Sequence, residues 1–282
     1  MVFRIFPFFF IDKKRGIFYV KITPMIKNDG NFIQYLKELK TLGAKAIKLE
    51  LESEYLQEDL CNKISDILKE NSLSLALKTG GFSSLNDIII SKNINADTIV
   101  APMVETDYAF KKFIETIKSV YLENELINKS IFINIETEFG IKNLDNILNT
   151  RYTDMLDGVV IGRGDLTSSL NLSHSLIDSD CMFETISPVI QKCQKAEKKV
   201  ILGGEITAKS VNFIKKFTPG TLFGFETRKV FFETSKVNLD YLPNIINKAI
   251  NFEIYYLNML LKFPNQNAGI LKKRITALQK RL

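Results

Sequence analysis

Short apolar stretches recur along the chain, and each is the length of a buried strand rather than of a helix. They are GIFYVKIT (16–23), AKAIKLEL (44–51), LSLALK (73–78), ADTIVAP (96–102), SIFINIE (130–136), LDGVVIG (156–162), KKVILGG (198–204) and GTLFGFE (220–226). Between them lie stretches with apolar residues every three or four positions, such as 31–43 and 56–71. The first of these ends in Gly43, a common C-terminal signal of a helix. The chain is therefore expected to alternate strands with helices.

This alternation predicts parallel strands joined by helical crossovers, because parallel neighbours need long connections. Eight such units fit an α/β fold of the (β/α)8 TIM barrel type better than an open doubly wound sheet. No GxGxxG or GxxxxGK[ST] follows the first strand, so a dinucleotide or P-loop site is not supported. Residues 1–235 are expected to form the catalytic barrel domain.

Residues 236–282 are expected to form an additional C-terminal helical extension. Within it, 241–263 reads as a helix that is apolar on nearly all sides. Such a helix is buried against the barrel or against another subunit. We favour the subunit contact, and hence a homo-oligomer.

The charge of the chain adds little to this picture. The net charge is +6, but 38 basic residues are spread along the chain and offset by 32 acidic ones. The densest basic stretch, ILKKRITALQKRL (270–282), has no acid and no interleaved aromatic residue. We interpret it as a solvated helix face rather than a nucleic-acid contact.

The apolar start, MVFRIFPFFFID, is interrupted by Pro7 and is too short for a membrane span of about 20 residues, so no membrane partner is expected.

Cysteine and histidine usage excludes several classes of site. Cys61, Cys181 and Cys193 are odd in number and form no CxxC pair, which favours a reducing, cytoplasmic location over a disulfide framework. His174 is the only histidine, so sites built from several histidines are excluded. Its polar surroundings, SLNLSHSL, indicate a surface residue.

Polar residues collect where the predicted strands end. In a barrel of this type the carboxyl ends of the strands, and the loops after them, form the active site. The residues at these ends are Glu50, Glu52, Lys78, Pro102, Glu105, Asn134, Glu136, Gly162 to Asp165, Gly203, Gly204, Glu205, Glu226 and Arg228.

Glu136 and Asp165 end adjacent strands and are candidate ligands for Mg²⁺ or Mn²⁺, which prefer hard oxygen donors. The alternative is a pair of salt-bridged rim carboxylates. The run Gly162-Arg163-Gly164-Asp165 could also be an ordinary tight turn or an exposed adhesion-type RGD; its place at a strand end argues against the latter. Its glycines would let backbone N–H groups approach a carboxylate, beside a helix expected to start near Thr167.

Two segments in order are similar to a known family. IFINIETEFGIKNLDNIL (131–148), followed by LDGVVIGRGDLTSSLNL (156–172), resembles the HpcH/HpaI aldolase/citrate lyase family, whose members are barrels with a pyruvate-kinase-like fold. ADTIVAPMVET (96–106) and KKVILGG (198–204) also fit its pattern. The resemblance extends over roughly 40–230.

The resemblance implies roles for several residues. Glu136 and Asp165 would be the metal ligands, and the backbone N–H groups of Gly164 and Asp165 would hold the substrate carboxylate. Lys78 falls where the family usually has an arginine that neutralises the pyruvate enolate; lysine keeps the charge but loses the bidentate geometry. Asn134 falls where aldolase members often carry a glutamine near the metal-bound water.

The chain also departs from the family. Aldolase members carry an acid–base histidine after the second strand, and Ser53 stands at about that place here. Glu50 and Glu52 resemble the acidic strand end of the citrate-lyase-like branch. Arg163 and Arg228 are not part of the general motif; we interpret them as a salt-bridge network at the rim, with anion binding as the alternative.

These residues together predict a divalent-metal-dependent carbon–carbon lyase or aldolase acting on a 2-oxo acid. The metal would be Mg²⁺, Mn²⁺ or Co²⁺, Lys78 would stabilise the enolate, and Glu50, Glu52 or a water on the metal would move the proton. One alternative is a citrate-lyase-like or malyl-CoA-type acyl lyase or condensing enzyme. Another, of a different class, is a catalytically inactive barrel that binds a carboxylate ligand.

Overall fold

The chain folds around a closed barrel of eight strands in the computed structural model, which describes residues 9–12, 17–20, 29–54, 56–217, 219–262 and 268–282. The strands follow the order β10-β3-β4-β5-β6-β7-β8-β9 around the barrel. Their bounds are β3 (Ala44–Glu50), β4 (Ser74–Lys78), β5 (Thr98–Ala101), β6 (Ser130–Ile135), β7 (Gly158–Gly162), β8 (Lys199–Gly203), β9 (Gly224–Glu226) and β10 (Val230–Glu233). The predicted α/β TIM barrel is confirmed.

The prediction for the first barrel strand was wrong. Of the predicted strand 16–23, residues Ile17–Val20 are described as β2, which pairs antiparallel with β1 (Phe9–Asp12) in a separate two-stranded sheet. Strand β10 completes the barrel instead, and it runs antiparallel to both β9 and β3. Both segments are short and apolar, so strand pairing, rather than composition, distinguishes them.

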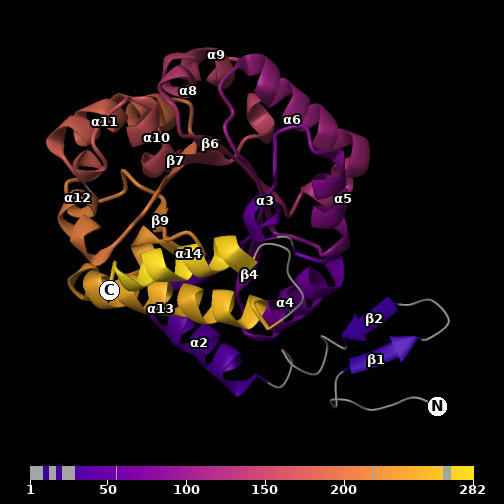
Figure 1. Cartoon of the computed structure of the whole chain (residues 1–282). Helices are drawn as coiled ribbons and strands as arrows, with labels where there is room; N and C mark the ends of the chain where they lie inside the picture. Colours follow the sequence, from indigo (N-terminus) through magenta and orange to yellow (C-terminus); the bar gives the residue numbers. More distant parts are fainter. Residues whose placement is uncertain (1–8, 13–16, 21–28, 55, 218, 263–267) are drawn as a thin grey trace.

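Helices surround the barrel, as Figure 1 shows. The helices between the strands are α2 (Gly30–Thr41), α3 (Leu51–Glu54), α4 (Glu58–Glu70), α5 (Leu85–Asn93), α6 (Asp107–Val120), α7 (Glu123–Leu126), α8 (Glu138–Lys142), α9 (Leu144–Leu148), α10 (Arg163–Ser169), α11 (Asp180–Lys195) and α12 (Val211–Lys215). Single 3₁₀ turns lie at Thr153–Met155, His174–Leu176, Ala208–Ser210, Thr234–Lys236 and Leu239–Tyr241. None of the described helices is both long and apolar enough to cross a bilayer.

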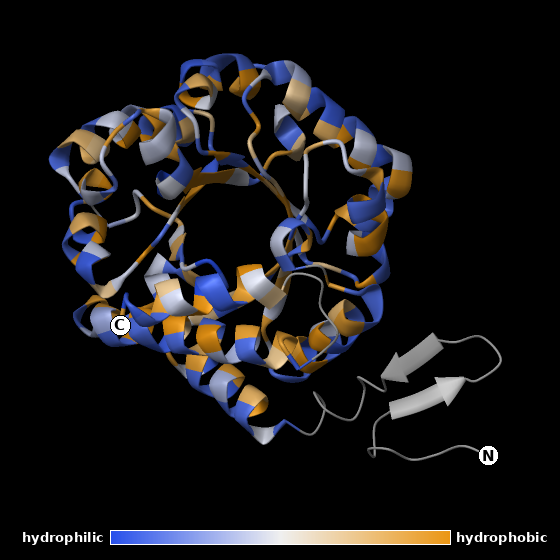
Figure 2. Cartoon of the chain, in the orientation of Figure 1, coloured by the Kyte–Doolittle hydropathy of each residue, from blue (hydrophilic) through white to orange (hydrophobic). Residues whose placement is uncertain are grey.

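Side chains alternate along each strand between the barrel interior and the surrounding helices. On β6, Ile131, Ile133 and Ile135 belong to the large core beneath the helices, whereas Phe132 belongs to a separate cluster inside the barrel. That interior cluster consists of Ala46, Val100, Phe132, Val160, Ile201 and Phe231. Figure 2 shows the corresponding pattern in the helices, whose apolar faces turn toward the barrel. The closed end of the barrel is thus filled with apolar side chains.

The last two helices, α13 (Leu242–Leu260) and α14 (Ala268–Gln279), pack on the barrel of their own chain. Phe252 of α13 stacks near Phe32 of α2, with ring centroids 5.9 Å apart. Most apolar side chains of α13 are buried in this way, so its composition is explained within one chain. The subunit contact expected for this helix stays a prediction. In Figure 1, α14 lies over one side of the barrel opening.

Candidate active site at the barrel mouth

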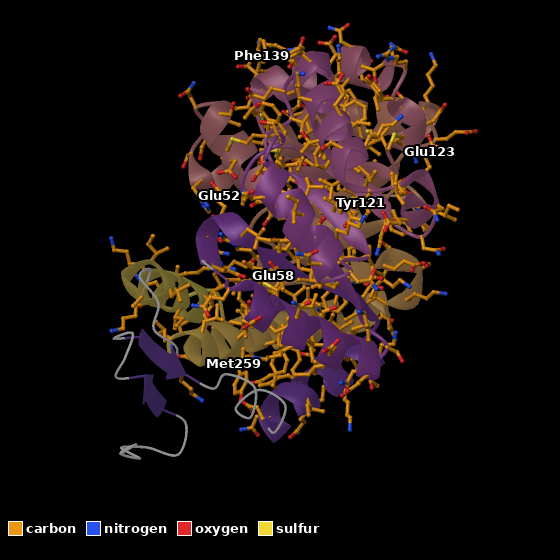
Figure 3. All side chains as sticks on the ribbon, turned by 90° about the vertical axis from the view of Figure 1, so that its right-hand side faces the viewer. Glu52, Glu58, Tyr121, Glu123, Phe139 and Met259 are labelled. Carbon is orange, nitrogen blue, oxygen red and sulfur yellow. The ribbon has the colours of Figure 1, made fainter. Side chains whose placement is uncertain are left out.

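The strand ends that the sequence singled out border one pocket, with a volume of about 920 Å³, at the mouth of the barrel. At this end of the barrel the inward faces of the strands carry polar side chains, because inward-facing positions recur every second residue. These pocket-lining polar side chains are Lys48, Glu50, Lys78, Asn134, Glu136 and Glu226. In the side view of Figure 3, Glu52 lies on this side of the barrel and Glu123 on the opposite side. The predicted active-site end is therefore the end with the pocket.

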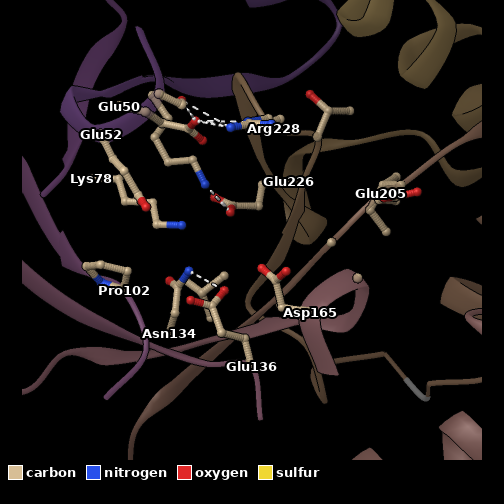
Figure 4. Close-up of a pocket in the computed structure, with 18 of the residues that line it drawn as sticks. Glu50, Glu52, Lys78, Pro102, Asn134, Glu136, Asp165, Glu205, Glu226 and Arg228 are labelled. Atoms are coloured by element: carbon tan, nitrogen blue, oxygen red, sulfur yellow. Dashed lines mark hydrogen bonds and ion pairs between the residues drawn. The ribbon is translucent and has the colours of Figure 1, made fainter. Parts of the chain in front are cut away.

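Glu136, just after β6, and Asp165, just after the neighbouring strand β7, point into this pocket, as Figure 4 shows. Ile135 pairs with Ile161, and this register puts Glu136 beside Gly162. A Cβ at Gly162 would lie 2.5 Å from Oε2 of Glu136, so any larger residue there would displace the carboxylate. Helix α10 begins at Arg163, not near Thr167 as predicted, which puts Asp165 in its first turn. The two predicted metal ligands thus face the same space.

The donor set around Glu136 fits a hard divalent cation. Glu136 accepts hydrogen bonds from the backbone N–H of Met103 at 3.0 Å and from Nδ2 of Asn134 at 3.0 Å, which fix the carboxylate. Oδ1 of Asn134 is buried and has no hydrogen-bond partner among the described residues. No hydrogen bond or ion pair joins Asp165 to another described residue. An exposed carboxylate and an unpartnered buried amide oxygen beside Glu136 are oxygen ligands of the kind that Mg²⁺ and Mn²⁺ use.

The protein supplies few ligands, however. Among the described residues, no group of three or more His, Cys, Asp or Glu side chains is arranged to hold an ion. A cation here would have two carboxylates and one amide oxygen from the chain, and water and substrate would complete its coordination. Mg²⁺ sites that also bind substrate often have few protein ligands.

Lys78 ends β4 and points into the pocket (Figure 4). It is half-buried, and among the described residues its ammonium group has no ion-pair or hydrogen-bond partner. Lys48, on the next strand, differs because it is buried and ion-paired with Glu226. Burial acts to lower the pKa of Lys48, but Glu226 and Glu50 outweigh this effect and raise it. Lys78 is therefore the lysine at the mouth whose charge is left for a ligand.

Glu50 is the centre of a buried ion-pair network. It accepts hydrogen bonds from Ser53 Oγ at 2.7 Å and from Arg228 Nε at 2.8 Å. Burial acts to raise the pKa of Glu50, but Lys229, Arg228 and Lys48 outweigh it and hold the pKa well below its usual range. A carboxylate so strongly held in its ionised form is a weak base near neutral pH. The proton-transfer role predicted for Glu50 is untested, and this environment opposes it.

The other acidic residues at the strand ends differ in their surroundings. Glu52 is exposed at the pocket edge, and its predicted role in proton transfer also stays a prediction. Glu105 does not border the pocket; it accepts a hydrogen bond from Thr137 Oγ1 at 2.6 Å. Pro102 lines the pocket wall.

The C-terminal basic stretch is not simply a solvated face, as the sequence suggested. Lys272, Lys273 and Lys280 are exposed, as expected. Arg274, by contrast, is mostly buried; it donates a hydrogen bond from Nε to Glu253 at 2.7 Å and lies 3.5 Å from Glu54. No local pattern indicates this burial, because the acidic partners lie on other elements.

Arg281, just after α14, contributes to the pocket rim. Its Nη2 lies 2.8 Å from Oε2 of Glu205, and both residues line the pocket.

His174 is on the surface, as predicted, with 64% of its side chain exposed. It also lines the pocket, which its sequence context did not indicate.

Arg163 holds the ends of β7 and β8 together beneath the mouth. The side chain is fully buried and donates to the carbonyls of Gly203 and Gly204, both at 3.0 Å. It also forms an ion pair with Asp178 and lies over the ring of Phe213, 4.9 Å from its centroid. The salt-bridge interpretation of Arg163 is confirmed, and a fully buried guanidinium with these partners has no group left for a substrate anion.

Arg163→Met is expected to lower the free energy of unfolding by about 3 kcal/mol, because it leaves Asp178 and three carbonyls without their buried partner. Urea denaturation followed by circular dichroism measures this loss. Arg151→Met, which removes an exposed arginine, is the matched control and should change stability by less than about 0.5 kcal/mol. Equal stabilities of the two variants would contradict the conclusion that Arg163 holds the ends of β7 and β8 together.

The chain is similar to known proteins in sequence and in structure. The family model described as HpcH/HpaI aldolase/citrate lyase matches residues 82–216. That range includes Glu136 and Asp165 but not Glu50 or Lys78. No curated protein matches the chain.

Solved structures similar to this chain share its fold at low identity. An HpcH/HpaI aldolase from Desulfitobacterium hafniense is 10% identical, with a TM-score of 0.58 over 84% of this chain and 90% of its own. A family protein from Burkholderia cenocepacia is 12% identical, with a TM-score of 0.55 over 78% and 89% of the two chains. Citrate synthase SbnG is 12% identical, with a TM-score of 0.53 over 65% and 78%. The family resemblance that the motifs predicted is confirmed over residues 82–216, where the chain matches the HpcH/HpaI aldolase/citrate lyase family model, and the solved structures show that the fold is shared.

Proposed function

We propose that the chain is a divalent-metal-dependent carbon–carbon lyase or aldolase that acts on a 2-oxo acid through its enolate. The observation that carries the proposal is the set of oxygens around Glu136, facing the unpaired ammonium group of Lys78 across the pocket. A bound Mg²⁺, Mn²⁺ or Co²⁺ would act as a Lewis acid on the carbonyl of the 2-oxo acid. Glu136, Asp165 and Oδ1 of Asn134 are the groups that would hold it.

Backbone groups at the start of α10 are suited to hold the substrate carboxylate. The first N–H groups of a helix have no partner within it, and here those of Gly164 and Asp165 border the pocket. Gly204 has a φ of 78°, and a Cβ there would lie 2.5 Å from the backbone nitrogen of Gly164. A glycine at this position therefore leaves space beside these N–H groups.

Lys78 would stabilise the negative charge that develops on the 2-oxo oxygen when the carbon–carbon bond breaks. A cation fixed in a partly desolvated pocket interacts more strongly with such charge than it does in water. Since Lys78 is not neutralised by a described carboxylate, its charge is directed to the ligand.

The test is exchange of the C3 protons of pyruvate for deuterium in D₂O, followed by NMR. This reaction requires enolate formation but no second substrate. The protein treated with EDTA should show no exchange above background, and Mg²⁺, Mn²⁺ or Co²⁺ should restore it. Exchange that is unaffected by EDTA would contradict metal dependence.

Two rivals predict other results. An acyl lyase would cleave an acyl-CoA ester and leave free 2-oxo acids unchanged. An inactive carboxylate-binding barrel would bind metal and pyruvate in calorimetry, with neither exchange nor turnover of aldehydes.

A further inference from the structure

His174 and Glu205 form a pair at the rim of the pocket that holds Glu136 and Asp165. Nε2 of His174 lies 2.8 Å from Oε2 of Glu205, which is within ion-pair distance. The carboxylate faces Nε2, and among the described residues the other ring nitrogen, Nδ1, has no hydrogen-bond partner, so it is available to a ligand in the pocket. The pair is thus arranged as an acid–base unit.

The pair stands next to the proposed metal ligands in the fold. A Cβ at Gly164 would lie 3.4 Å from Cγ of Glu205, so Glu205 lies against the residue that precedes Asp165. Arg163 binds the carbonyls of Gly203 and Gly204 and thereby fixes the backbone just before Glu205. In Figure 4, Glu205 lies to one side of the cluster of Lys78, Glu136 and Asp165. If the enolate end of the substrate is bound by Lys78, Glu136 and Asp165, the rest of the substrate can extend toward Glu205.

The backbone at Glu205 is strained. Its φ of 53° is in the left-handed region, which non-glycine residues seldom adopt. Such conformations persist where the surroundings impose them, and they are concentrated at functional sites. Stability does not explain the pair, because exposed ion pairs contribute little and both side chains are accessible, 64% for His174 and 34% for Glu205.

We propose that His174 is a catalytic acid–base residue for the hydroxyl at C4 of a 4-hydroxy-2-oxo acid, and that Glu205 is its positioning residue. This inference rests on the proposed lyase function. In cleavage, Nδ1 of His174 takes the hydroxyl proton, the O–H electrons form the C4 carbonyl, and the C3–C4 bond breaks. The electron pair of the broken C3–C4 bond passes to the enolate. C3 then takes a proton from water, and His174 returns its proton to water.

Arg281 supports this arrangement from the C-terminal side. It lies 2.8 Å from the same oxygen, Oε2, of Glu205 that faces His174. Its guanidinium therefore helps to hold the Glu205 carboxylate in place beside His174.

The test compares two reactions of His174→Ala. Proton exchange at C3 of pyruvate needs no C4 hydroxyl, so the variant should exchange within about twofold of the native rate. Condensation of pyruvate with glycolaldehyde, glyoxylate or acetaldehyde should fall by about 100-fold or more, because general acid–base catalysis typically contributes 10²–10⁴-fold. Glu205→Gln should slow condensation by about 10-fold and leave exchange unchanged. Ser175→Ala, an exposed neighbour that does not line the pocket, is the matched control for both reactions.

The possible outcomes separate this inference from the proposed function. If native protein shows no metal-dependent exchange, the proposed function fails and the inference fails with it. If native protein exchanges but condenses no aldehyde, or if His174→Ala condenses within threefold of native, only the inference is overturned. Loss of both reactions in a folded His174→Ala variant would also overturn it, because His174 would then act at C3.

Discussion

Glu136→Gln and Asp165→Asn are each expected to abolish metal-dependent exchange of the pyruvate C3 protons. Each change keeps the side-chain shape but removes a negative charge from a site to which the described residues contribute two carboxylates, so neither variant should hold the cation. We expect the rate to fall by about 1,000-fold or more, since both metal and oriented charge are lost. Calorimetric titration with Mn²⁺ should show one bound ion in native protein and none in either variant.

Glu138→Gln is the matched control for these two variants. Glu138 follows Glu136 by two residues, but its side chain is exposed and ion-paired with Lys142 on the helix surface. It should bind Mn²⁺ and catalyse exchange at the native level. Native affinity for Mn²⁺ in Glu136→Gln or Asp165→Asn would show that the two carboxylates are rim residues and not ligands.

Lys78→Met is expected to reduce kcat for exchange by about 100-fold to 1,000-fold while Mn²⁺ binding is retained. The reason is that Lys78 carries the unpaired positive charge opposite Glu136 and Asp165, and methionine keeps the length of the side chain without that charge. Stability should change little, because no ion pair with a described residue is lost. A stopped-flow or NMR exchange assay with saturating metal measures the effect.

Two further variants make this result specific. Lys78→Arg should recover part of the lost activity, since the charge returns with a different geometry. Lys45→Met removes an exposed lysine from the opposite end of β3 and should have no effect. Unchanged exchange in Lys78→Met would exclude this residue from the stabilisation of the enolate.

The polar residues at the strand ends could be predicted from the sequence because two simple rules apply together there. Apolar runs of strand length mark where each strand lies, and the alternation of sides carries Asn134 and Glu136 inward with Phe132. Seven of the eight predicted strands overlap barrel strands, and Glu136 and Asp165 fall in one pocket for that reason. The local sequence pattern is sufficient to predict where a side chain points when that direction depends only on the residue's own strand.

Contacts between segments that are distant in the sequence could not be predicted in the same way. The segment 230–233 follows the predicted eighth strand closely and looks like its continuation, and only pairing with β3 distinguishes it from the equally apolar 16–23. Arg274 and Arg281 look like the lysines beside them until Glu253 and Glu205 are placed next to them. His174 becomes notable only when the end of β8 brings Glu205 to it.

The antiparallel strand β10 also has a consequence for how the molecule folds. β9 and β10 are joined by a short turn and can form a hairpin early, whereas the pairing of Val230 with Ile47 must wait until nearly the whole barrel has been assembled. The ion pairs of Lys48 with Glu226 and of Arg228 with Glu50 connect the two sides of this last seam. Folding intermediates should therefore leave these charges hydrated and unpaired, and the rate of the final step should depend on salt in a way that formation of the parallel strands does not.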